Sequence, residues 1–233
     1  MLQNIVLAFA ALAGLASAAP ATIQERGLSD TYHKYTGDGS TKAGWPAESA
    51  WGDFNSLWSA NLPLIKQSCG WNGWGADNSA DEINHLKSAI TQVASETGVQ
   101  SRFILLIVMQ ESKGCVRVPT TGNGVRNPGL MQSHNGKGTC AGVNPCPQSQ
   151  ILQMIRDGTA GTSSGDGLKQ TTAKTLAHFG GKSQPAVYYS AARLYNSGSV
   201  DYAHLENGLG STPCYASDVA NRFHGWTLAK STC

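Results

Sequence analysis

Apolar residues follow the spacing of an amphipathic helix most clearly between Ser79 and Gly98. They recur at steps of three and four residues, at Ile83, Leu86, Ile90 and Val93. The opening sequence Ser-Ala-Asp-Glu places Ser79 at the N-cap and Glu82 at the third helical position, which is a capping box. Gly98 is typical of a residue that ends a helix. The pattern therefore predicts a helix with one buried face.

The next segment, Ser101 to Ser112, differs because its apolar residues are continuous. Phe103 to Met109 lead directly into Gln110 and Glu111. Leu and Met within this run, and the absence of Pro and Gly, favour a helix over a strand. A helix that is apolar on all sides is buried, and Gly114 is expected to end it. We therefore predict a core helix with a carboxylate at its end.

Shorter patterns predict the remaining elements. Phe54 to Ser68 fits an amphipathic helix that is interrupted at Pro63. Pro147 fits the first turn of a helix. Residues 114–146, rich in Gly and Pro, predict a loop with short strands. Further helices are expected at about 167–178, 185–195 and 214–226. The predicted class is mainly α (α+β), with a helical core and a small irregular or β lobe.

The N-terminal part of the chain divides into three segments by composition. An apolar run followed by Ala-Ser-Ala predicts a secretory signal peptide at 1–18. Residues 19–26 are a candidate pro-segment. Residues 27–78 are rich in Trp and Gly and have no linker after them, so we expect an extension packed on the core of the domain 79–233. In this interpretation the tryptophans anchor the extension; a sugar-stacking platform is the alternative.

Cysteine content agrees with export from the cell. The chain has six cysteines, an even number that favours three disulfides without fixing their connectivity. They are Cys69, Cys115, Cys140, Cys146, Cys214 and Cys233. The cysteines and histidines do not show metal-ligand spacing, so no metal is expected. We therefore predict a secreted, disulfide-stabilised protein.

Charge excludes some partners and suggests another. The net charge of +2 is too small to indicate nucleic-acid binding. The N-terminal apolar run is too short for a membrane span, and nothing else in the chain is long enough. Residues 112–156 contain no Asp or Glu. Their basic residues are Lys113, Arg117, Arg126, Lys137 and Arg156. This segment is either a solvated loop or a surface that faces an anionic polymer.

Glu111 is the first candidate for chemistry. On a helix it follows Ile107 and Val108 by one turn, so its own face is apolar. Desolvation of a carboxyl group favours the protonated form and raises the pKa. A glycosidase needs a protonated group of this kind to protonate the leaving oxygen. The alternative is an ordinary helix-end glutamate that reaches solvent beside Lys113.

Two later segments support the catalytic interpretation. They are Asn-Pro-Gly-Leu-Met-Gln-Ser at 127–133 and Ala-Arg-Leu-Tyr-Asn-Ser-Gly at 192–198. Together with Glu111-Ser112, and with a weaker Tyr-Val pattern at Tyr215 and Val219, they resemble the motifs of the goose-type lysozyme and soluble lytic transglycosylase family. Leu194 departs from the family pattern, which has Ala there. The resemblance covers roughly residues 80–226 and implies a lysozyme-like fold.

The resemblance also implies a role for each matching residue. Glu111 would be the catalytic acid, and Tyr195 would direct its hydroxyl at Glu111 or at the substrate. Gln132 and the backbone around Met131 would hold the N-acetyl group of a bound sugar. Asn196 would fix the loop or a sugar hydroxyl. Ser112 would orient the acid or act as a hydrogen-bonding residue at the helix end.

A second carboxylate would decide the mechanism. Hydrolysing glycosidases pair the acid with a base or nucleophile. Asp157 and Asp166 are the nearest downstream candidates, and both lie in or beside Gly-containing turns. Lytic transglycosylases use one carboxylate, because the 6-hydroxyl of the sugar attacks and an anhydro-sugar is released. The absence of acidic residues in 112–156 favours this single-glutamate scheme.

The expected function is cleavage of the β-1,4 bond between N-acetylmuramic acid and N-acetylglucosamine in peptidoglycan. A chitin-cleaving glycosidase on the same scaffold is one alternative, since both polymers have N-acetyl groups. A non-catalytic wall-binding protein is another. We expect a monomer without a cofactor, and neither nucleic acid nor membrane as a partner.

Overall fold

The computed structural model describes residues 27–122 and 124–233, so the predicted signal peptide (1–18) and pro-segment (19–26) lie outside the described residues. The described part is mainly helical, as predicted, with one two-stranded sheet. Its α-helices are α1 (Phe54–Ile65), α2 (Ser68–Trp71), α3 (Ala80–Thr97), α4 (Ser101–Ser112), α5 (Gln148–Ala160), α6 (Leu168–His178), α7 (Pro185–Ser197) and α8 (Tyr215–Phe223). The strands are β1 (Thr121–Gly122) and β2 (Arg126–Asn127), and two 3-10 turns span Thr41–Ala43 and Glu48–Ala50.

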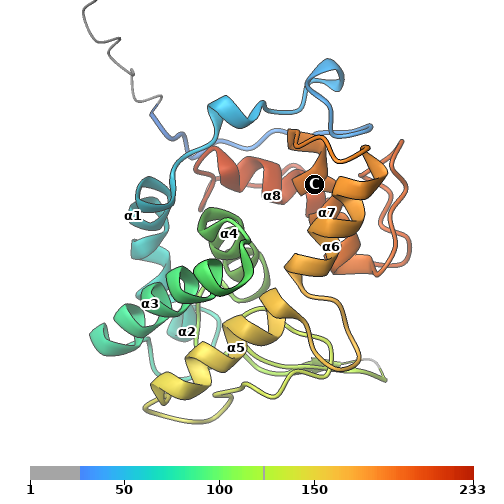
Figure 1. Cartoon of the computed structure of the whole chain (residues 1–233). Coiled ribbons are helices and arrows are strands. Elements are labelled where there is room, and N and C mark those ends of the chain that lie inside the picture. The colour runs from blue at the N-terminus through green and yellow to red at the C-terminus, as the bar shows by residue number, and fades with distance from the viewer. Residues whose placement is uncertain (1–26, 123) are drawn as a thin grey trace, which may run out of the picture.

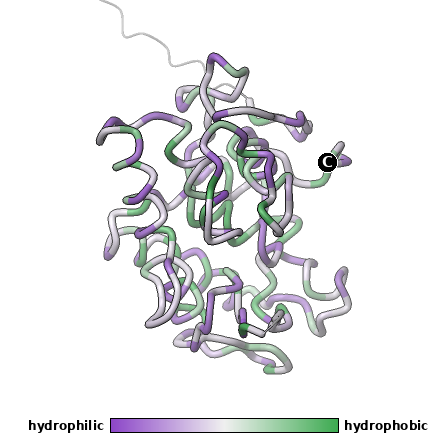
Figure 2. Tube along the Cα trace, turned by 90° about the vertical axis from the view of Figure 1, so that its right-hand side faces the viewer, coloured by the Kyte–Doolittle hydropathy of each residue, from purple (hydrophilic) through white to green (hydrophobic). Residues whose placement is uncertain are grey.

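Helix α4 lies at the centre of the molecule, with α1, α3 and α8 packed around it (Figure 1). Every residue from Phe103 to Met109 is 0% exposed, which confirms the prediction of a core helix. In Figure 2 hydrophobic stretches gather toward the middle of the trace and hydrophilic positions predominate in the outer loops. Burial of such side chains stabilises the fold by about 1.5–3 kcal/mol each. The apolar run 103–109 therefore forms the centre of the hydrophobic core.

The helix ends agree with the predicted signals in most places. Ser79 and Glu82 form the predicted capping box at the start of α3, and Gly98 ends the helix in the left-handed conformation. Two predictions were wrong in detail. Helix α1 continues through Pro63 to Ile65, because the proline lies in the last turn and removes only one backbone donor. Helix α4 ends at Ser112, as predicted, but the left-handed residue that caps it is Lys113 (φ 56°), one residue before the expected Gly114.

Residues 27–78 pack against the helices through their tryptophans. The Trp51 ring stacks on Phe223 of α8 with 3.9 Å between ring centroids, and Trp45 lies 4.9 Å from Tyr189 of α7. Trp58 is also buried. Trp71 is the exception, with 62% of its surface exposed. The anchoring interpretation therefore holds for the buried tryptophans and not for Trp71.

The lobe between α4 and α5 consists of loops around a minimal antiparallel hairpin. Thr121 pairs with Asn127 and Gly122 with Arg126. The Asp157 carboxylate of α5 accepts hydrogen bonds from the backbone N–H groups of Lys137 (2.7 Å) and Gly138 (2.8 Å). These bonds hold the lobe on the helical part with little regular strand.

All six cysteines pair, as predicted, and the structure fixes the connectivity. Cys69–Cys115 joins α2 to the segment that follows α4, Cys140–Cys146 closes a loop in the lobe, and Cys214–Cys233 ties the C-terminal residue to the start of α8. The first bridge spans 46 residues and lies immediately after the end of the core helix. The bridge therefore restrains the end of α4, which carries Glu111.

Candidate functional site

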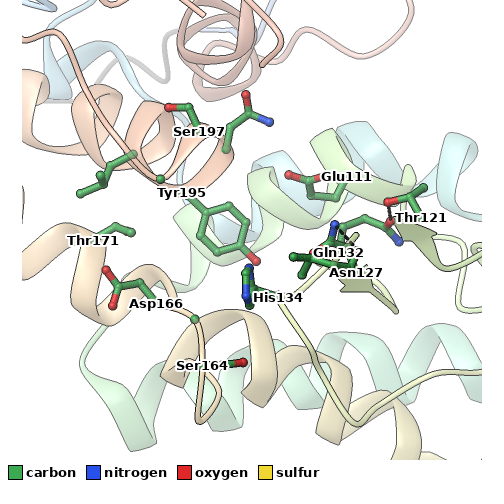
Figure 3. A pocket seen from close by; sticks show the side chains of 15 residues that line it. Glu111, Thr121, Asn127, Gln132, His134, Ser164, Asp166, Thr171, Tyr195 and Ser197 are labelled. Atoms are coloured by element: carbon green, nitrogen blue, oxygen red, sulfur yellow. Dashed lines mark hydrogen bonds between the residues drawn. The ribbon is translucent and has the colours of Figure 1, made fainter. Parts of the chain in front are cut away.

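A cavity of about 560 Å³ opens where the end of α4 meets the hairpin lobe and the end of α7 (Figure 3). Polar groups from five parts of the chain surround it. The lining residues are Glu111, Thr121, Val125, Asn127, Gln132, His134, Ser164, Gly165, Asp166, Thr171, Leu194, Tyr195, Asn196, Ser197 and Gly198. The cavity thus brings together all three sequence motifs, which are far apart along the chain.

Glu111 lies in the last turn of α4, at the edge of the cavity. The side chain is half-buried, and the apolar residues of its own helix remove most of the water behind it. This desolvation raises the pKa of the Glu111 carboxyl to about 7, although a hydrogen bond from Tyr215 and the charge of Lys113 act in the opposite direction. Near neutral pH a large share of the molecules therefore hold Glu111 as the acid.

Tyr215, at the start of α8, is the tyrosine that contacts Glu111. Its hydroxyl donates to Glu111 Oε1 at 2.5 Å. The hydroxyl of Tyr195 instead donates to the backbone oxygen of Met131 at 2.8 Å, so of its two predicted partners, Glu111 and the substrate, Glu111 is not the one that it contacts. Tyr195 still lines the cavity. The sequence singled out Tyr215 only through its spacing from Val219, as a weak part of the family resemblance, and that spacing does not reveal a partner so distant in the chain.

A partly buried polar network holds Gln110, the residue next to the acid. Gln110 donates to Asp218 Oδ2 (2.9 Å) and accepts from Arg222 Nε (2.8 Å), and both partners lie on α8. The Tyr32 hydroxyl donates to Asp218 Oδ1 at 2.6 Å. Because Gln110 precedes Glu111, this network fixes the rotation of the last turn of α4. Sequence reasoning missed this network, since it predicted no role for any of its members.

Gln132 does not have the free amide that substrate binding was predicted to use. Its Oε1 accepts from Thr121 Oγ1 at 2.7 Å, and its Nε2 donates to the backbone oxygens of Pro119 (3.2 Å) and Gly129 (3.0 Å). Both amide hydrogens therefore have protein acceptors. The side chain clamps the lobe beside the cavity, and only its backbone and its outer surface remain for a ligand.

Two other predicted binding residues are buried. Ser112 is 0% exposed, and its hydroxyl donates to Val108 O at 2.9 Å, so it is a hydrogen-bonding residue at the helix end, one of the two roles expected for it. The Met131 side chain is also 0% exposed and packs against Gly158, where an added Cβ would overlap it. Its backbone oxygen binds Tyr195. Neither side chain can contact a ligand.

The two candidate second carboxylates have different surroundings. Asp157 is 7% exposed and does not line the cavity; besides Lys137 and Gly138 it accepts from Gln153 Nε2 at 2.7 Å. These contacts belong to the fold, and they argue against the predicted share of Asp157 in the chemistry. Asp166 does line the cavity and forms an ion pair with Lys174 of α6. Figure 3 shows Asp166 and Glu111 on opposite sides of Tyr195.

The basic segment is less basic at the surface than its sequence indicates. Arg117 is buried and pairs with Glu82 at 2.5 Å, and Arg156 pairs with Glu96 at 2.6 Å. Glu82 also accepts from the backbone N–H of Cys146, so the Arg117 pair is part of the fold. Arg126 and Lys137 remain exposed. Of the predicted cationic surface, only Arg126, Lys137 and the half-buried Lys113 therefore remain without an acidic partner among the salt bridges of the described residues.

His134 lines the cavity, although sequence reasoning did not select it. Within residues 27–122 and 124–233, no group of three or more His, Cys, Asp or Glu side chains could hold a metal ion. In the same ranges, no helix is both long and apolar enough to cross a membrane.

The comparisons with known proteins give no further information about the site. No protein-family model matches the chain, and no curated protein matches it.

Proposed function

We propose that this protein is a secreted glycosidase with a lysozyme-like fold, which cleaves the β-1,4 bond between N-acetylmuramic acid and N-acetylglucosamine in peptidoglycan. The observation that supports it most is the position of the Glu111 carboxyl at the edge of a polar cavity, where desolvation raises its pKa to about 7. A central buried helix that ends in this acid, beside a small hairpin lobe, agrees with the fold proposal. Three disulfides agree with an oxidising compartment.

In the proposed reaction Glu111 first acts as an acid. Its proton passes to the glycosidic oxygen as the bond from that oxygen to C1 breaks, and positive charge develops on the sugar. The acetamido group of the same sugar stabilises that charge. The Tyr215 hydroxyl keeps the resulting Glu111 carboxylate hydrogen-bonded and in place. This first step needs no second carboxylate.

The second step distinguishes transglycosylation from hydrolysis. Asp157 is engaged in the fold and Asp166 is paired with Lys174, so neither is a free base close to Glu111. We therefore propose that the 6-hydroxyl of the muramic residue attacks C1 and that its proton returns to the Glu111 carboxylate. The product is a 1,6-anhydro sugar, and Glu111 is again protonated for the next cycle.

Digestion of purified peptidoglycan and of chitin oligomers, with product masses determined, tests this proposal. The expected products are peptidoglycan fragments that end in anhydromuramic acid, each one water lighter than the hydrolysis product. Reducing ends would show that water attacks, and would point to Asp166 or His134 as a base. Faster cleavage of chitin than of peptidoglycan would show that chitin, and not peptidoglycan, is the preferred substrate. No cleavage of either polymer would overturn the proposal in favour of a binding protein.

A further inference from the structure

Arg193 is a buried cation directly behind the cavity wall. It lies on α7, and it is 0% exposed. Its Nη1 donates to the backbone oxygens of Thr212 (2.7 Å) and Pro213 (3.2 Å), and its Nη2 donates to Asn196 Oδ1. Within the described residues no carboxylate forms a salt bridge with it. Burying an arginine without a counter-ion is costly, so its position needs an explanation beyond packing.

The chemistry of the guanidinium group fixes the orientation of the Asn196 amide. Guanidinium has hydrogen-bond donors and no acceptor. The atom of Asn196 that meets Arg193 must therefore be the oxygen, and the NH2 group must lie on the other side of the amide. That nitrogen makes no hydrogen bond to any described residue, and Asn196 lines the cavity. The contrast is with Gln132, whose amide hydrogens both have protein acceptors.

Arg193 also lies next to the partner of the acid. Its guanidinium carbon is 5.9 Å from the centre of the Tyr215 ring, at the distance of a cation–π contact. The Tyr215 hydroxyl in turn donates to Glu111. One buried side chain therefore contacts both Asn196 and the tyrosine that holds Glu111, and it fixes the separation between them.

We propose that Arg193 is a positioning residue, which locks the Asn196 amide so that its NH2 group donates a hydrogen bond to an acceptor oxygen of the bound glycan. This inference rests on the proposed function and makes it more specific. Acetamido carbonyls and hydroxyls provide such oxygens in both peptidoglycan and chitin. The lactyl carboxylate provides one in peptidoglycan alone. The site is thus built to recognise an acceptor beside the scissile bond.

Asn196→Asp is the sharpest test, because it keeps an oxygen for Arg193 and replaces the NH2 group with a second oxygen. The variant should fold, since its carboxylate forms an ion pair with Arg193. It should bind glycan at least about tenfold more weakly, the effect of one lost hydrogen bond. Binding of a chitin and of a peptidoglycan tetrasaccharide would be measured by calorimetry in the Glu111→Gln background, which prevents turnover. A larger loss for peptidoglycan would identify the lactyl carboxylate as the acceptor.

Asn207→Asp is the matched control. Asn207 is exposed, lies outside the cavity lining, and also uses its Oδ1 as an acceptor, from the backbone N–H of Leu209 (3.2 Å). It should bind both tetrasaccharides with unchanged affinity. Arg193→Met should weaken binding when Asn196 is present and add little in an Asn196→Ala background. If the Arg193→Met variant does not fold, the Asn196→Asp result alone decides whether the Asn196 amide binds the glycan.

The outcomes separate this inference from the proposed function. If the Glu111→Gln protein binds both tetrasaccharides and Asn196→Asp binds them equally well, the positioning role of Arg193 is overturned and the proposed function stands. If the Glu111→Gln protein binds neither tetrasaccharide and the parent cleaves neither polymer, both are overturned.

Discussion

Replacing Glu111 by Gln should reduce glycan cleavage by about 10²- to 10⁴-fold, the usual contribution of a general acid. The amide has nearly the same shape and can still accept the hydrogen bond from Tyr215. It cannot give a proton to the leaving oxygen. The rates would be measured at pH 6, where the parent is mainly protonated because the pKa of Glu111 is about 7. Turnover equal to that of the parent would remove Glu111 from the mechanism.

Stability provides the control for this substitution. The folded pKa of about 7 lies above the ordinary 4.5, so the folded parent holds the proton more tightly than the unfolded chain. The contribution of Glu111 to the stability of the parent is therefore fully present below about pH 4.5, and it is lost as the pH rises toward 7. The glutamine does not titrate, so at pH 8 the variant should be more stable by up to about 3 kcal/mol, less where solvent reaches the carboxyl. If Glu111→Gln were instead less stable than the parent at pH 8, its loss of activity would be explained by misfolding.

An exposed glutamate gives a matched comparison. Glu96 is on the surface of α3 and pairs with Arg156, away from the cavity. Glu96→Gln should keep the cleavage rate of the parent. Loss of activity in both variants would show that the effect is not specific to Glu111.

Removing the Cys69–Cys115 bridge by a double substitution to Ser should lower the free energy of unfolding by about 4 kcal/mol. The reason is that the bridge closes a loop of 46 residues. Without the bridge this loop has more conformational freedom in the unfolded chain, which stabilises the unfolded state. Removing Cys140–Cys146, which closes 6 residues, should cost only about 2 kcal/mol. Urea unfolding of the two double variants measures both values. The reverse order would contradict the entropic account.

The first bridge should also affect the site, because Cys115 lies four residues after Glu111. Asn78 reinforces the same junction: its Nδ2 donates to the backbone oxygens of Ile65 and Gly114 at 2.8 Å each. An added Cβ at Gly114 would lie 2.8 Å from Ile65, so the segment packs closely there. Loss of Cys69–Cys115 should therefore reduce cleavage more than loss of Cys140–Cys146, when both are assayed under conditions where they remain folded.

Local signals were sufficient for most of the helices. The capping box of Ser79 and Glu82, the glycine at 98 and the continuous apolar run 103–109 act within one or two turns, and the structure confirms them. Errors occurred where the chain tolerates a local cost. Pro63 is accommodated in the last turn of α1, and Lys113, a residue other than glycine, takes the left-handed conformation at the end of α4.

Long-range pairings could not be read from the sequence. The even cysteine count predicted three disulfides, but many connectivities satisfy it. Arg117 looked like a surface cation until the structure placed it against Glu82, 35 residues away. Two of the five basic residues in 112–156, Arg117 and Arg156, thus have acidic partners that lie far away in the sequence.

The candidate site was predicted in part. Glu111 was selected because an apolar helix leads into it, and the cavity brings it together with Tyr195, Asn196 and Gln132. The roles of individual atoms were not predictable: Tyr215 takes the contact with Glu111, and Gln132 uses its amide for the lobe. Hydrogen-bond partners depend on a few ångströms of tertiary placement, which motif spacing does not determine.

The central claim is that the core helix holds Glu111 as an acid near neutral pH. ¹³C NMR titration of the Glu111 carboxyl carbon, assigned by comparison with Glu111→Gln, tests it most directly. The account predicts a pKa of about 7 in the folded protein. A pKa near the ordinary 4.5 would show that water reaches the carboxyl freely and would contradict the account.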